Sequence, residues 1–335
     1  MPEKRKHHYV PAFQLALFTA DGTKDGDFYV FDLDRKIIRT STPHNEAHKA
    51  NLYTPDEGAL AGTSDPAAAR SQFEDFLAGM ESEIAPIIKQ IVKTGMLPTD
   101  LSHRKSIFEF VATSIFRTPE FLQQANANAM QFAQQFALRT LRSDEMWKQH
   151  QARKAAEGKP VDDSERAKLI GLFQKHPHAV AVNRGSILET MPKAIELAVP
   201  LLERRQWRLE VLAPENGELA LPNCPVTVFQ SSGVVPYDLQ CVLAKDTLIL
   251  LPLSPCTLLV SHNVRHIELN PPNKILPTAA AHANTAAFDS LKQRGKVDDK
   301  VACMFARGPD FPMVASNNTI TTFSELFPEF NIGPR

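Results

Sequence analysis

The histidines near the start of the chain are the residues best suited to chemistry. Four of the 11 histidines, His7, His8, His44 and His48, fall within the first 48 residues. Imidazole both ligates metals and transfers protons near neutral pH. If residues 43–49 are helical, His44 and His48 lie on one face at a separation that lets both reach one metal. The alternative is that His7 and His8 fix the N-terminus by hydrogen bonds, while His48 is a solvated surface residue.

A second candidate group consists of helical carboxylates and one arginine. Glu81 and Glu83 lie in the first long predicted helix, and Arg117 ends the next one, just before Pro119. Two closely joined helices pack antiparallel, so a carboxylate and the guanidinium are expected to meet at their interface, where a buried charge needs a partner. Arg117 then either forms a structural ion pair with Glu81 or Glu83, or points into a pocket and binds an anion.

The cysteines indicate a reducing compartment. They form no C-x-x-C pair, so they are interpreted as buried thiols rather than disulfides. These residues are Cys224, Cys241, Cys256 and Cys303. His262 and His266 follow Cys256, but no second Cys pair completes a zinc site. No apolar leader and no apolar run long enough to cross a bilayer is present, so a cytoplasmic protein with no membrane partner is expected.

Composition limits the classes of partner and cofactor. The 37 Lys and Arg residues nearly balance the 38 Asp and Glu residues, so the net charge of -1 cannot draw the whole protein onto nucleic acid. Nucleic acid remains a possible partner only through local basic runs: Lys4-Arg5-Lys6, Arg204-Arg205 with Arg208, and Lys292 to Lys300. Glycine-rich phosphate-binding motifs are absent, so no nucleotide cofactor is expected.

The order of elements that must position these residues predicts an α+β fold. It consists of an N-terminal β-hairpin over residues 27–40, a central helical layer, and a C-terminal, mostly antiparallel sheet with one late helix near 279–293. The segments expected are 1–64, 65–206 and 207–335, forming one compact domain or two tightly packed ones. Within the helical region, residues 148–168 are expected to be an exposed loop because of Gly158-Lys159-Pro160.

The opening Lys6-His7-His8-Tyr9-Val10-Pro11-Ala12-Phe13-Gln14-Leu15 closely resembles the start of the bacterial domain-of-unknown-function family numbered 4238. The segment Asn45 to Tyr53, Arg117-Thr118-Pro119 and Leu251-Pro252-Leu253-Ser254-Pro255 follow in the order expected for that family. One departure is Pro222-Asn223-Cys224-Pro225, where the family commonly carries S-D-x-P. An amide thus stands where a carboxylate is usual. The resemblance implies a fold and a bacterial origin, with no established activity.

The His-His-x-x-Pro start also looks like that of HNH and endonuclease VII type toxins. This resemblance implies a histidine general base and a metal that holds the scissile phosphate, beside a hairpin and a helix that supply an asparagine and a second histidine. Here His8, the 27–40 hairpin, Asn45 and His48 occur in that order. The 37 residues from His8 to Asn45 exceed the spacing of that compact finger.

Two functions are therefore carried forward. The first is a metal-assisted phosphodiesterase, a nuclease of bacterial defence or a toxin, in which His8 deprotonates water and Arg117, with Glu81 beside it, neutralises phosphate charge. Its single divalent ion, Mg, Mn or Zn, has three expected ligands: His7, Asn45 and His48. The second is a non-catalytic ligand-binding or protein-interaction module with a structural His cluster.

Overall fold

A computed structural model of the chain describes residues 6–60, 64–176, 182–213, 217–230, 233–234, 247–262, 279–294, 303–315 and 319–332. Several residues named above lie outside these ranges: Cys241, His266, Lys4, Arg5 and residues 295–300. The chain forms two compact units. The first comprises Met1–Thr54, Ser71–Phe121 and Met191–Arg335, and the second comprises Pro55–Arg70 and Leu122–Thr190. They are described separately.

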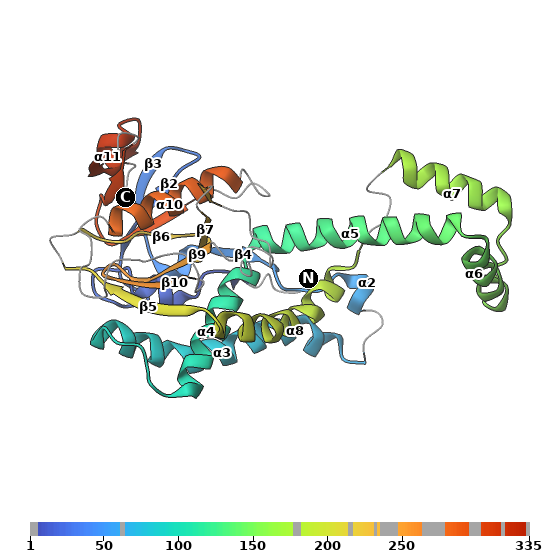
Figure 1. Cartoon of the computed structure of the whole chain (residues 1–335), viewed down its shortest axis with the longest axis horizontal. Helices are drawn as coiled ribbons and strands as arrows, with labels where there is room; N and C mark the ends of the chain where they lie inside the picture. Colours follow the sequence, from blue (N-terminus) through green and yellow to red (C-terminus); the bar gives the residue numbers. More distant parts are fainter. Residues whose placement is uncertain are drawn as a thin grey trace. The chain divides into compact units, whose positions relative to one another are not determined.

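In the first unit, N-terminal and C-terminal segments share one sheet (Figure 1). Its strand order is β14 (Asn331–Ile332), β3 (Ile37–Ser41), β2 (Phe28–Asp32), β11 (Cys303–Ala306) and β6 (Leu221–Pro222). The strands β2 and β3 form the expected hairpin, with Val30 opposite Arg39. The neighbour of β2 on its other side is β11, which pairs Phe305 with Val30. The C-terminal strands are thus divided among three sheets rather than gathered in one.

Helix α10 (Ala279–Arg294) and the short helix α11 (Phe323–Leu326) cover the sheet around β2 (Figure 1). Phe31 of β2 contacts Phe311 and Phe323 edge-on, at ring centroid distances of 4.8 and 5.0 Å. Phe288 of α10 joins the same buried cluster. Alternation along β2 sends Phe31 to this core.

The second five-stranded sheet of the unit is wholly antiparallel. Its order is β5 (Gln206–Val211), β10 (Thr257–His262), β9 (Thr247–Ser254), β7 (Thr227–Gln230) and β8 (Gly233–Val234). The β-branched and apolar residues at 249, 251, 258, 259 and 260 are buried, which is typical of strands covered on their faces. Two-stranded ladders join β1 (Lys6–His8) to β4 (His48–Ala50), and β12 (Pro312–Val314) to β13 (Ile320–Thr322).

The first unit also contains the short helix α1 (Ala12–Ala16) and three long helices: α3 (Pro66–Thr94), α4 (Leu101–Phe116) and α8 (Arg184–Glu203), of which α3 and α8 continue into the second unit. Apolar residues at helical spacing, including Leu77, Ile84 and Ile88, form the buried stripe of α3. Gly95, with φ of 65°, ends α3 because a left-handed residue after the last turn costs glycine no steric strain. Asp100 begins α4 by accepting a hydrogen bond from the His103 N–H at 3.0 Å.

The second unit corrects the expectation of a long exposed loop at residues 148–168. Its helices are α2 (Glu57–Leu60), most of α5 (Pro119–Arg142), α6 (Asp144–Ala156) and α7 (Asp163–Lys175). Ser143 and Asp162 cap α6 and α7. The Trp147 Nε1–H donates to Asp163 at 2.8 Å and joins these two helices. Only residues 157–162 form a connection. The expectation was wrong because Ala, Gln, Lys, Arg and Glu favour helix even where nearly every side chain is exposed.

The fold is therefore α+β, as expected, with an N-terminal hairpin, central helices and C-terminal antiparallel strands. Among the helices that the structure describes, none combines the length and apolar character needed to cross a membrane.

Candidate functional site

The first two histidines lie on opposite faces of a short strand in the first unit. In the antiparallel β1–β4 ladder, His7 is opposite Lys49 and His8 is opposite His48. Successive side chains of a strand point to opposite faces. The two histidine side chains therefore lie in two separate environments, one on each side of the ladder.

On one face, His7 is buried and joined to Tyr53. The His7 Nδ1 atom accepts a hydrogen bond from the Tyr53 N–H at 2.9 Å, and the two rings are stacked with centroids 5.4 Å apart. A neutral imidazole that accepts at Nδ1 carries its proton on Nε2. The Tyr53 hydroxyl in turn donates to the Arg117 carbonyl at 2.7 Å. The contacts connect β1, the segment after β4 and the end of α4.

Arg117 caps the C-terminal end of α4, and its side chain is only 2% exposed. Its Nη1 donates to Glu81 Oε1 of α3 at 2.7 Å, and its Nη2 donates to the His8 carbonyl. Burial alone would lower the pKa of Arg117, but Tyr53 and Glu81 outweigh it and hold that pKa above its ordinary value. The contact between Arg117 at the end of α4 and a glutamate of α3 is present, and the guanidinium stays charged.

On the other face, His8 meets His48 edge to face with ring centroids 5.5 Å apart. Burial, followed by the positive potentials of His48 and Arg117, lowers the pKa of His8 to about 4, against the opposing effect of a hydrogen bond to the Glu46 backbone. The His8 Nδ1 atom is buried and has no hydrogen-bond partner within the described ranges. His8 is therefore a neutral imidazole at physiological pH, with one ring nitrogen unused.

The three expected metal ligands do not share one face. His7 points away from the side on which His8 and His48 meet, and Asn45 is exposed, with its Nδ2 donating to Thr42 at 3.1 Å. In the described part of the chain, no group of three or more His, Cys, Asp or Glu side chains has an arrangement that could hold a metal ion. The structure brings together His8 and His48, but not His7 or Asn45 with them.

Residues 43–49 do not form one helix, so the condition for His44 and His48 to share a helical face is not met. A three-residue 3-10 helix, η1 (Pro43–Asn45), is followed by Glu46 in an extended conformation and by Ala47 with φ of 49°. Those two residues end the turn and lead into β4. His44 consequently faces Asp25, 3.6 Å away, instead of sharing a helical face with His48.

Polar residues that neither function expected from the sequence uses lie around the buried Tyr9. Burial, together with Cys303 and Glu120, raises the pKa of Tyr9 well above its ordinary value, while a hydrogen bond with the Asn223 side chain lowers it. The Asn223 N–H donates to the Cys303 carbonyl at 2.9 Å. One Glu120 carboxylate oxygen is buried without a hydrogen-bond partner among the described residues.

The signal for this group lay in the motifs themselves. Tyr9 follows the paired histidines, Glu120 follows Arg117-Thr118-Pro119, and Asn223 lies in Pro222-Asn223-Cys224-Pro225. The sequence profile of DUF4238, described as a protein of unknown function, matches residues 6–290 and so spans all three motifs. The chain belongs to the DUF4238 family. The DUF4238 motifs, far apart along the chain, thus meet around one buried tyrosine. No curated protein and no solved structure gives a significant match.

In the basic run of Arg204, Arg205 and Arg208, which the structure describes in full, two of the three guanidinium groups have partners within the protein. Arg205 is buried and donates to Ser261 at 2.9 Å and to Thr247, and burial lowers its pKa to about 10. Arg208 lies 2.6 Å from Glu210. This run is therefore part of the second sheet's own packing.

Proposed function

We propose that this member of the DUF4238 family is a non-catalytic binding module whose His-rich motif has a structural role. His7, the His8 carbonyl, Tyr53, Glu81 and Arg117 hold β1 against α3 and α4, and this group is called the latch. The observation that carries the proposal is the state of Arg117: its side chain is 2% exposed, and its two Nη groups donate to Glu81 and the His8 carbonyl. An arginine that stabilises a phosphoryl transition state must present donors to the substrate. Here those donors connect β1, α3 and α4.

Metal content tests the latch. Protein purified in chelator, then dialysed against zinc, manganese or magnesium, is expected to retain less than stoichiometric metal and to leave single- and double-stranded DNA and RNA intact. Stoichiometric metal that disappears in His8→Gln and His48→Gln, but persists when exposed His103 is changed to Gln, would replace the latch with a metal centre.

The second candidate is the metal-assisted phosphodiesterase or nuclease, acting in bacterial defence or as a toxin. What favours it is the closeness of His8 and His48, since a neutral imidazole with an unused nitrogen suits either proton transfer or ligation of zinc, the one of Mg, Mn and Zn that imidazole prefers. In this enzyme His8 would take the proton from water, His48 would hold the metal with His7 and Asn45, and Arg117, which Glu81 positions, would balance phosphate charge. It requires His7 and Asn45 to move, and nucleic acid to be the substrate.

A cytoplasmic location completes the proposal. Its support is that Cys224, Cys256 and Cys303 are free thiols, which suits a reducing compartment. Fractionation of cells that express a tagged chain tests it, and recovery of the chain with secreted protein would contradict it.

A further inference from the structure

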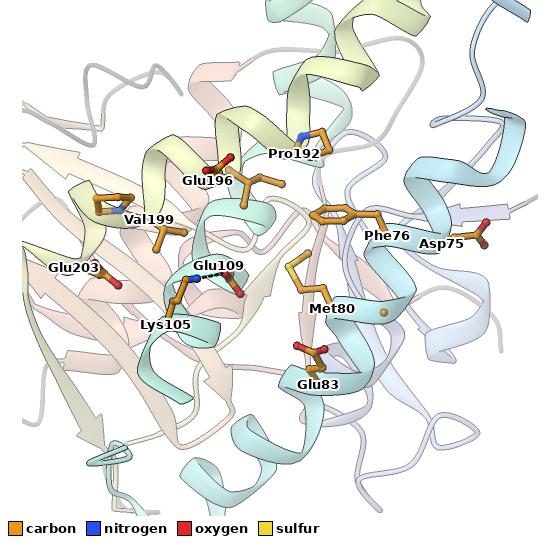
Figure 2. Close-up of a pocket in the computed structure, with 13 residues that line it drawn as sticks. Asp75, Phe76, Met80, Glu83, Lys105, Glu109, Pro192, Glu196, Val199 and Glu203 are labelled. Atoms are coloured by element: carbon orange, nitrogen blue, oxygen red, sulfur yellow. Dashed lines mark ion pairs between the residues drawn. The ribbon is translucent and has the colours of Figure 1, made fainter. Parts of the chain in front are cut away.

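A groove of about 650 Å³ lies in the first unit, away from the His motif, where α3, α4 and α8 face one another (Figure 2). Its volume falls within the range of sites that bind ligands or side chains of a partner. Both the base and the rim of this groove consist of side chains from these three helices.

The base of the groove is apolar. Phe76 and Met80 extend from α3 toward α8, whose Pro192 and Val199 form the opposite wall (Figure 2). Phe76 is 37% exposed, although large apolar side chains are usually buried. Covering this surface would remove apolar area from water, which favours association.

The rim of the groove is acidic. It contains five carboxylates and a single lysine: Asp75, Glu83, Glu109, Glu196, Glu203 and Lys105. Lys105 is already 3.6 Å from Glu109. Within the described ranges, no ion pair is formed by Asp75, Glu83 or Glu203. The field around the apolar base is therefore negative, and it repels nucleic acid and anionic lipid.

We propose that the groove binds a basic amphipathic helix of a partner protein. The proposal rests on the binding-module function and names its partner class. Apolar side chains of such a helix would cover Phe76 and the half-buried Met80, and its flanking Lys or Arg side chains would meet Glu83 and Glu203. Grooves between helices accept the side-chain ridges of another helix. Charge complementarity at the rim selects a basic partner.

The probe is a fluorescein-labelled peptide of about 15 residues, long enough for a helix when bound, with Leu at i, i+3, i+4 and i+7 and Lys elsewhere. Anisotropy is expected to show saturable one-to-one binding. The double variant Glu83→Lys with Glu203→Lys should weaken it by about tenfold or more. The matched control, Asp27→Lys with Glu189→Lys, reverses two exposed carboxylates outside the groove and should bind as wild type does.

The apolar base is tested separately. Phe76→Ala should weaken binding by about tenfold, whereas Phe132→Ala, which removes an aromatic ring that is 71% exposed outside the groove, should not. Circular dichroism melts confirm that each variant is folded. Equal binding of a scrambled peptide, or equal losses in groove and control variants, would overturn the proposal, as would a dimer of this chain that covers the groove.

The failure of this proposal is distinguishable from failure of the module function. If the peptide does not bind while metal and hydrolysis assays stay negative, the groove proposal alone is lost. If the protein hydrolyses nucleic acid with stoichiometric metal, the module function is lost whatever the peptide does.

Discussion

Arg117 is the residue on which the latch depends most, because one buried guanidinium joins three elements. Arg117→Ala removes the partner of Glu81 and of the His8 carbonyl, and it is expected to lower the free energy of unfolding by about 3 kcal/mol. Urea denaturation measures the change. Arg35→Ala is the matched control, since the Arg35 side chain is 68% exposed and its removal should cost less than about 0.5 kcal/mol.

An Arg117→Ala protein that melts within a few degrees of wild type yet loses a ligand or an activity would contradict the structural role and support the enzyme.

His8 makes stability depend on pH. Its folded pKa of about 4 lies below the ordinary value of 6.5, so between these values the unfolded chain binds a proton that the folded chain does not. Stability is therefore present above pH 6.5 and is lost as the pH falls toward 4. Because His8 is partly exposed, about 2 kcal/mol is expected over this window.

The measurement compares urea denaturation of wild type and His8→Gln from pH 4 to pH 7. The variant should show a shallower rise in stability with pH, while His103→Gln on α4 should retain the wild-type slope. Identical slopes in all three proteins would show that His8 is not responsible.

At the scale of elements, the reactivity of the cysteine thiols tests whether the strands that carry them are buried. Cys303 on β11 and Cys224 just after β6 are buried, whereas Cys256 in the turn between β9 and β10 is half-buried. Burial, then the carboxylates of Asp32 and Glu46, raises the pKa of Cys303 above its ordinary value, so little reactive thiolate is present. Of the three cysteines that the structure describes, Cys256 should be modified first when native protein is alkylated.

Peptide mass spectrometry after alkylation reads each site, and the same reaction in urea provides full modification as the reference. Rapid native modification of both Cys224 and Cys303 would mean that the strands are not buried as described.

Several elements could be predicted from local patterns. The 27–40 hairpin, the apolar stripes of α3 and α4, and strands β5, β7, β9 and β10 follow from periodicity and turn residues. The short strands β1 and β4 could not be predicted, because three residues carry no period. They exist because each satisfies the backbone hydrogen bonds of the other.

At the scale of the whole molecule, strands from the N-terminal and C-terminal parts of the chain pair with one another in the first unit. β2 pairs with β11, which lies more than two hundred residues later, and β3 pairs in parallel with β14. The predicted segments 1–64, 65–206 and 207–335 follow changes in composition and predicted secondary structure along the chain. The two compact units are instead assembled from three and two separate stretches.

The sequence by itself determined the α+β class, most long helices, the family and two alternatives for Arg117, a carboxylate partner or an anion, because these depend on residue type and short spacing. Tertiary structure decided which residues meet. It placed His8 beside His48 and His7 beside Tyr53, and it paired Arg117 with Glu81. It also brought Glu120 and Asn223 near Tyr9 and formed the acidic groove. Such contacts arise when distant segments bury apolar surface together and their polar groups must then find partners, a condition that no local pattern encodes.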